Sequence, residues 1–134
     1  MLHSLNVRDH MTRSIITLQP EQDVIEAALI LSERHISGAP VVDDTGNLAG
    51  ILSDTDCIRA MLKIGFDPDW RGLVSEFMSP KVSVVDIDDS ILDVAQKFTE
   101  ARFRRYPVME DNRVVGVVSR ADVLRALERV KNWQ

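Results

Sequence analysis

The chain repeats itself over almost its whole length. A shift of 67 residues aligns seven identical residues of the first half with the second half, and a shift of 66 aligns five more. The identical pairs are Val7/Val74, Met11/Met78, Ala28/Ala95, Glu33/Glu100, Pro40/Pro107, Val41/Val108, Asp44/Asp111, Gly50/Gly116, Ser53/Ser119, Asp56/Asp122, Arg59/Arg125 and Ala60/Ala126. A duplicated unit of this size is too small to close its own core, so it buries its apolar face against its copy. We expect one pseudo-symmetric body with related clefts between the copies.

The net negative charge of the chain disfavours partners that bind basic proteins. The chain has 134 residues and a formal net charge of -5. Nucleic acid and anionic membrane surfaces both favour basic proteins, so neither is an expected partner. The N-terminal sequence lacks the apolar segment of a signal peptide, and no stretch approaches the roughly 20 apolar residues that span a bilayer. We therefore expect a cytoplasmic protein.

Each copy has the pattern of a β-α-β-β-α unit, which predicts an α+β fold. In the first copy we expect strands at 15–18, 40–42 and 48–52 and helices at 24–34 and 53–63. In the second we expect strands at 82–85, 106–109 and 114–118 and helices at 91–102 and 121–130. Short lead-ins at 5–10 and 73–77 are candidate helices. Residues 65–72 read as a connector, so the two repeats are expected to span 1–66 and 67–134.

A Ser-x-x-Asp motif opens the last helix of each copy, at Ser53 with Asp56 and at Ser119 with Asp122. One interpretation is structural, because a serine N-cap and an acid three residues later satisfy free backbone N–H groups. The other is functional, because a helix N-terminus favours a bound phosphate and a carboxylate accepts hydrogen bonds from sugar hydroxyls. Recurrence in both copies fits the two interpretations equally.

The order of these motifs resembles that of the CBS domain, named after cystathionine β-synthase, and two in tandem resemble a CBS pair, or Bateman module. The matching phrases are HMTRSIITLQPEQDVIEAA, SGAPVVDDTGNLAGILSDTDCIRAM, FMSPKVSVVDIDDSILDVA and RRYPVMEDNRVVGVVSRADVLRAL. The resemblance implies one pseudo-twofold pair that binds an adenosine derivative such as AMP, ADP, ATP or S-adenosylmethionine. It also implies a regulatory sensor without catalytic activity.

The resemblance further implies which residues bind the ligand. Asp56 and Asp122 would accept hydrogen bonds from ribose, with Ser53 and Ser119 near the phosphates. One cleft would join Ser53 and Asp56 to Val82, Ser83, Arg104, Arg105 and Tyr106. The other would join Ser119, Arg120 and Asp122 to Ile15, Ile16, Thr17, Ser37, Gly38 and Ala39.

The two copies differ most where a ligand would be charged. Before the Pro-Val strand, the second copy has Arg104 and Arg105 where the first has Ser37 and Gly38. Guanidinium groups bind phosphate oxygens through paired donors, although arginines near a helix end also complement the helix dipole. Asp54 stands where Arg120 stands in the second copy, and a carboxylate beside a phosphate is unfavourable. We expect at most one cleft to bind tightly, or the two to prefer different phosphate counts.

Other chemistry is poorly supported by the sequence. His3, His10 and His35 have no partners at the spacing of a metal site, and no Gly-rich phosphate loop or catalytic triad pattern occurs. We expect no enzyme and no required cofactor, with an adenine nucleotide as regulatory ligand. The expected partners are a second copy in a homodimer and an unidentified protein. The alternatives are a ligand-free interaction scaffold, a binder of S-adenosylmethionine, and a small enzyme that acts on nucleotides with Mg²⁺.

Two aromatic residues in the connector are open to two interpretations. Phe66 and Trp70 are apolar groups in a segment that would otherwise be solvated. They either pack on the core of the pair or mark a contact with another chain.

Overall fold

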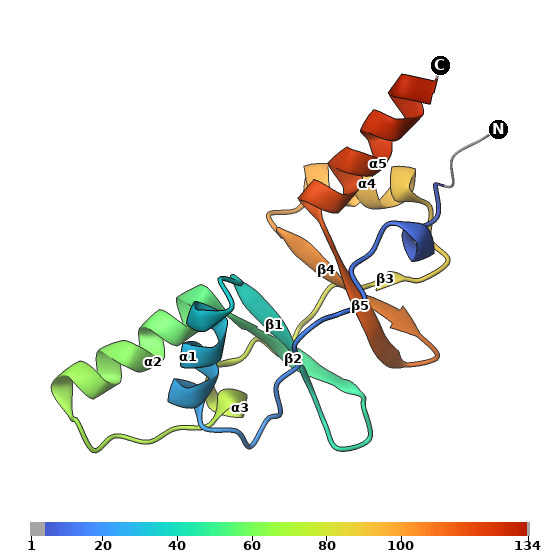
Figure 1. Cartoon of the computed structure of the whole chain (residues 1–134). Coiled ribbons are helices and arrows are strands. Elements are labelled where there is room, and N and C mark those ends of the chain that lie inside the picture. The colour runs from blue at the N-terminus through green and yellow to red at the C-terminus, as the bar shows by residue number, and fades with distance from the viewer. Residues whose placement is uncertain (1–4, 134) are drawn as a thin grey trace. The chain divides into compact units, whose positions relative to one another are not determined.

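The computed structural model describes residues 5–133, and the chain forms two compact units (Figure 1). Unit 2 is the continuous segment Ile16–Val82, and unit 1 combines the residues up to Ile15 with those from Ser83 onward. The chain thus passes from unit 1 into unit 2 and back. No helix in the described residues is long and apolar enough to cross a membrane.

Unit 2 contains an antiparallel hairpin and a pair of packed helices. Its elements are α1 (Val24–Glu33), β1 (Gly38–Val42), β2 (Leu48–Ser53), α2 (Asp54–Phe66) and the short α3 (Val74–Phe77). Helix α1 begins where the Asp23 carboxylate accepts hydrogen bonds from the amides of Ile25 and Glu26. The core of this unit includes Val24 and Leu31 of α1, Leu52 of β2 and Ala60 of α2.

Unit 1 has a three-stranded sheet and a second pair of packed helices. Its elements are the 3-10 helix η1 (Val7–Asp9), β3 (Val85–Asp86), α4 (Ile91–Glu100), β4 (Arg105–Glu110), β5 (Arg113–Ser119) and α5 (Arg120–Trp133). Strand β4 lies between β3, to which it is parallel, and β5, to which it is antiparallel. Tyr106 is 2% exposed at the centre of the core, 4.7 Å from the Phe98 ring between centroids.

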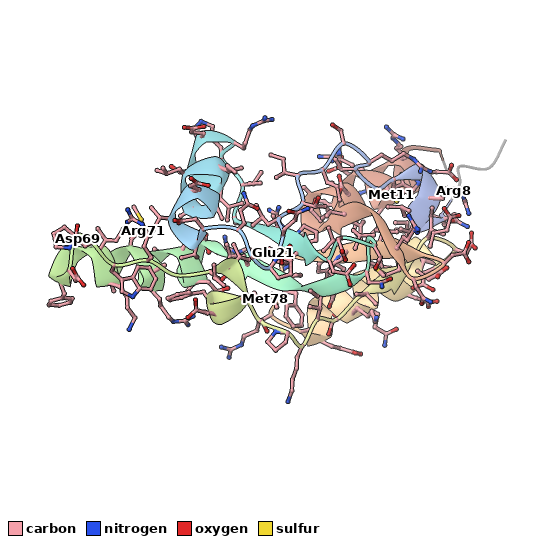
Figure 2. The ribbon with its side chains drawn as sticks, turned by 90° about the horizontal axis from the view of Figure 1, so that it is seen from below. Arg8, Met11, Glu21, Asp69, Arg71 and Met78 are labelled. Atoms are coloured by element: carbon pink, nitrogen blue, oxygen red, sulfur yellow. The ribbon has the colours of Figure 1, made fainter. Side chains whose placement is uncertain are left out.

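The lead-in of each repeat packs with the body of the other repeat. Val7 and Met11 belong to the core of unit 1, which is otherwise built from the second repeat. Val74 and Met78 belong to the core of unit 2, which is otherwise built from the first repeat. Figure 2 labels the two methionines, one in each unit. The repeats at 1–66 and 67–134 therefore describe the duplication of the sequence, whereas each compact unit contains a lead-in from the other copy.

The helices and hairpins of the sequence analysis are confirmed, as are both helical lead-ins, but the first strand of each copy is not placed as expected. In the first copy only Leu18 forms a bridge, parallel to Val41. Its amide donates to the Pro40 carbonyl at 2.9 Å, and its carbonyl accepts from the Val42 amide at 2.8 Å. In the second copy the strand is displaced to Val85–Asp86. These strands were predicted from runs of β-branched residues. In both copies the backbone pairs with the hairpin only from the last residue of the run, Leu18 or Val85.

The two aromatic residues of the connector have different environments. The Trp70 ring meets the Phe77 ring edge to face, with centroids 5.5 Å apart, and packs against the core of unit 2. Phe66, at the end of α2, is 92% exposed. Packing on the core is thus confirmed for Trp70, and contact with another chain remains an interpretation for Phe66.

Candidate functional site

The Ser-x-x-Asp motif of unit 2 forms a reciprocal cap at the start of α2. The Ser53 hydroxyl accepts a hydrogen bond from the Asp56 amide at 3.2 Å, and Asp56 Oδ2 accepts from both the amide and the hydroxyl of Ser53 at 2.9 Å. Asp56 Oδ1 accepts from the Arg59 guanidinium at 2.8 Å. The motif therefore places an aspartate that is only 8% exposed at the N-terminus of a 13-residue helix.

The motif of unit 1 has the same geometry at the start of α5. The Asp122 amide donates to Ser119 Oγ at 3.2 Å, the Ser119 amide donates to Asp122 Oδ2 at 2.9 Å, and Arg125 donates to Asp122 Oδ1. Asp122 is 6% exposed. Asp56 and Asp122 are the two buried charged residues of the described chain.

These contacts confirm the capping interpretation and leave room for a ligand. A carboxylate offers about four acceptor positions, and these hydrogen bonds use three on Asp56 and two on Asp122. The sequence analysis missed that Arg59 and Arg125 pair with these acids. Their recurrence in register, three residues after each aspartate, is the signal that could have found the pairs.

The segment before each Pro-Val strand lies beside the Ser-x-x-Asp motif of its own unit. Gly38 pairs with Ser53 across the hairpin, and the Asp54 amide donates to the Ser37 carbonyl at 2.8 Å. Unit 1 has the equivalent contacts. Arg105 pairs with Ser119 across the hairpin, and the Arg120 amide donates to the Arg104 carbonyl at 3.2 Å.

Within each unit the segment is therefore the hairpin neighbour of its own motif. The grouping of each segment with the motif of the opposite copy stays a prediction. The two strands of a tight hairpin are necessarily neighbours, and the motif directly follows the second strand. Unit 2 holds Ile16, Thr17, Ser37, Gly38, Ala39, Ser53, Asp56 and Val82. Unit 1 holds Ile15, Ser83, Arg104, Arg105, Tyr106, Ser119, Arg120 and Asp122.

Two of the expected site residues are too deeply buried for their side chains to contact a ligand. Ala39 is 2% exposed and Tyr106 is 2% exposed, so their side chains serve the cores of their units. The Tyr106 hydroxyl donates to the Lys97 carbonyl at 3.3 Å, and burial raises its pKa. Thr17 and Ser83 are exposed, whereas Ile15, Ile16 and Val82 are half-buried.

Arg104 and Arg105, at the start of β4, do not complement the dipole of α4. That helix ends at Glu100, its last-turn cation is Lys97, and Arg104 and Arg105 follow four and five residues later. Arg104 and Arg120 form no salt bridge with the residues that the structure describes. The helix-end interpretation therefore does not account for them.

Neither a reactive thiol nor a metal centre accompanies the motif. Cys57, next to Asp56, is 7% exposed, and burial together with the nearby carboxylates of Asp56 and Asp54 raises its pKa to about 11. A thiol with so high a pKa is a poor nucleophile near neutral pH. Within residues 5–133 no three His, Cys, Asp or Glu side chains are grouped as metal ligands, and His3 lies outside the described residues.

Comparison with known proteins decides the family. The model of the CBS domain matches residues 7–63 and again residues 74–129. The chain belongs to the CBS domain family. It is a CBS pair, with an α+β fold built from two tandem repeats, as the order of its motifs indicated.

Solved structures of other CBS pairs share this fold. The crystal structure of CBSX2 from Arabidopsis thaliana in complex with AMP superposes with a TM-score of 0.82 at 30% identity, covering 96% of this chain and 99% of that one. The CBS domain pair of protein MJ0100, in complex with 5′-methylthioadenosine and S-adenosyl-L-methionine, has a TM-score of 0.78 at 28% identity, with coverage of 95% and 98%. Both neighbours hold adenosine-derived ligands.

One curated relative is a longer protein. Uncharacterized protein MJ1225 of Methanocaldococcus jannaschii is 31% identical over 122 residues. The match covers 90% of this chain but only 42% of that relative. The chain thus spans less than half of the length of MJ1225.

Proposed function

We propose that this CBS pair reversibly binds an adenosine nucleotide at its Ser-x-x-Asp motifs and signals occupancy to a protein partner. AMP bound to CBSX2 and the two adenosine compounds bound to MJ0100 support an adenosine ligand. We assign ribose recognition to Asp56 and Asp122, and the 5′ substituent to the helix N-termini at Ser53 and Ser119.

The observation that carries the proposal is the pair of buried carboxylates at helix N-termini. Burial of a charged group is unfavourable unless it is compensated, and here a serine and an arginine compensate it in both units. The carboxylate keeps acceptor positions for hydroxyl groups. The dipole of each helix favours an anionic or polar 5′ group beside its N-terminus.

The proposed role is regulatory and not catalytic. A ligand switches a protein only to the extent that it binds two arrangements with different affinity, so the signal would arise from a ligand-dependent shift of the pair. We propose a cytoplasmic homodimer as the working form. The exposed apolar side chains of α2 support a contact with a second copy, since Ile58 and Leu62 are each 60% exposed and Phe66 is 92% exposed.

A thermal-shift panel of AMP, ADP, ATP, GTP, NAD and S-adenosylmethionine tests the proposal. A ligand at 100 times its dissociation constant adds about 2.7 kcal/mol to the free energy of unfolding, which raises Tm by roughly 8 °C for a chain of this size. The proposal predicts such a shift with an adenine nucleotide and none with GTP. Unchanged Tm with every compound would favour the ligand-free scaffold instead.

A further inference from the structure

Around the two Ser-x-x-Asp motifs, the residues that differ in charge between the units occupy equivalent backbone positions. The amide that opens α2, on Asp54, bonds to the Ser37 carbonyl, and the amide that opens α5, on Arg120, bonds to the Arg104 carbonyl. The next residue of each segment pairs across the hairpin with the serine of the motif. The set Ser37, Gly38 and Asp54 in unit 2 therefore corresponds to Arg104, Arg105 and Arg120 in unit 1.

The two sets have opposite charge around otherwise matching motifs. The set in unit 1 carries three positive charges, and the set in unit 2 carries one negative charge. Arg104 and Arg120 are exposed without a salt bridge to any described residue, and the exposed Asp54 carboxylate accepts a hydrogen bond from the amide of Thr55 at 2.8 Å. The charges of Asp54, Arg104 and Arg120 are thus available to a ligand at the motif.

Helix stability explains Asp54 but not Arg120. The N-terminus of a helix carries a partial positive charge, which favours an acid and disfavours a cation in the first turn. Asp54 follows this preference, whereas Arg120, the first residue of α5, violates it. A residue that breaks a local rule without a structural gain marks a functional position.

The proposed ligand supplies the reason for the difference. A 5′-phosphate next to Arg104, Arg105 and Arg120 would meet guanidinium groups, which bind phosphate oxygens with paired donors. The same phosphate next to Asp54 would meet a carboxylate, which repels it electrostatically. A neutral or cationic 5′ group meets no such repulsion.

We propose that the two units bind different chemical classes of adenosine compound, and that Asp54 and Arg120 determine the difference. Unit 1 takes a compound with a 5′-phosphate or polyphosphate. Unit 2 takes one whose 5′ position is neutral or cationic. This inference rests on the proposed function, because it assumes that an adenosine compound binds at both motifs.

Isothermal titration calorimetry on the full chain tests the inference, with AMP and 5′-methylthioadenosine as probes. The wild type is expected to bind one AMP per chain. Arg120→Asp is expected to weaken AMP binding by at least about tenfold while leaving 5′-methylthioadenosine affinity unchanged. Asp54→Arg is expected to raise the AMP stoichiometry from one to two per chain. The matched control is Asp44→Arg, the same charge reversal in the exposed hairpin turn of unit 2, for which the stoichiometry stays at one.

The titrations distinguish failure of the difference between the units from failure of adenosine binding itself. If neither probe binds the wild type, both fail. If AMP binds the wild type at two equivalent sites, or if Asp54→Arg still binds one AMP with unchanged affinity for 5′-methylthioadenosine, the inference is overturned and the proposed function stands. Circular dichroism on each variant shows that a loss of binding does not come from unfolding.

Discussion

Thr12 and Val117 exchange two backbone hydrogen bonds, of 2.8 and 2.9 Å, and so fix the N-terminal lead-in to β5. Ser79 and Ile51 exchange the corresponding bonds, of 2.9 and 3.0 Å, in unit 2. A glycine neighbours each contact, because a side chain there would collide with the lead-in. A Cβ on Gly116 would lie 2.6 Å from the Thr12 carbonyl oxygen, and one on Gly50 would lie 2.6 Å from that of Ser79.

Gly116→Ala is therefore expected to destabilise the protein. The added methyl group meets backbone, which cannot move as a flexible side chain can, so we expect a loss of about 1–3 kcal/mol in the free energy of unfolding measured in urea. Gly65→Ala is the matched control. It lies inside α2 with nothing within 4 Å, so it is expected to stabilise by up to about 1 kcal/mol. Equal effects of the two substitutions would contradict the contact at Gly116.

Two fragments of nearly equal length are expected to differ in stability. Residues 16–82 contain the whole of unit 2 with its lead-in, whereas residues 67–134 lack Val7 and Met11 from the core of unit 1. We expect cooperative thermal unfolding for 16–82 and a weak, non-cooperative signal for 67–134, measured by circular dichroism at 222 nm. Cooperative unfolding of 67–134 alone would show that its lead-in is dispensable.

The Cys57 thiol is expected to be unreactive in the folded protein at pH 8. Its pKa is raised from 9.0 to about 11, so the thiolate fraction at this pH is roughly a hundredfold lower than in the unfolded chain. Because the folded pKa exceeds the unfolded one, this group leaves stability unchanged below pH 9 and reduces it as the pH rises from 9 to 11. The measurement is the rate of reaction with Ellman's reagent, with and without urea, and equal rates would contradict burial of the thiol.

The proposed homodimer is expected to depend on the exposed face of α2. Leu62→Glu places a charge in the middle of that face and is expected to shift the mass measured by light scattering towards the monomer. Ser75→Glu is a control at another exposed position of unit 2 and is expected to leave the mass unchanged. A wild-type monomer, or a dimer in both variants, would contradict the use of this face.

Sequence reasoning was most effective where a pattern is local. Helix α1 was predicted from the spacing of Val24, Ala27 and Leu31, and the caps were predicted from Ser53 and Ser119, because both depend on residues within one or two turns. The family followed from the ordered recurrence of such patterns. The exchange of lead-ins was not foreseen, since it depends on contacts such as Met11 with Gly116 that join distant parts of the chain.

The candidate site was predicted in part. The motif residues and their neighbours in the hairpin lie together within each unit, and the strand pairing of Gly38 with Ser53 that joins them was not foreseen. The grouping across the copies stays a prediction. Tyr106 was expected at the ligand, yet its ring fills the core. Alternation along a strand does not reveal which of two apolar faces is buried when both strands of a hairpin are largely apolar.

The most direct test of the account is calorimetric titration of AMP into the wild type and into Asp56→Asn and Asp122→Asn, under conditions where all are folded. Asparagine keeps an acceptor for the serine amide but loses the charge that would bind ribose hydroxyls, so we expect one of the two variants to bind AMP about 10–100 times more weakly. Asp23→Asn makes the same change at the cap of α1 and is expected to bind as the wild type does. Wild-type affinity in both motif variants would contradict the assignment of ligand binding to the Ser-x-x-Asp motifs.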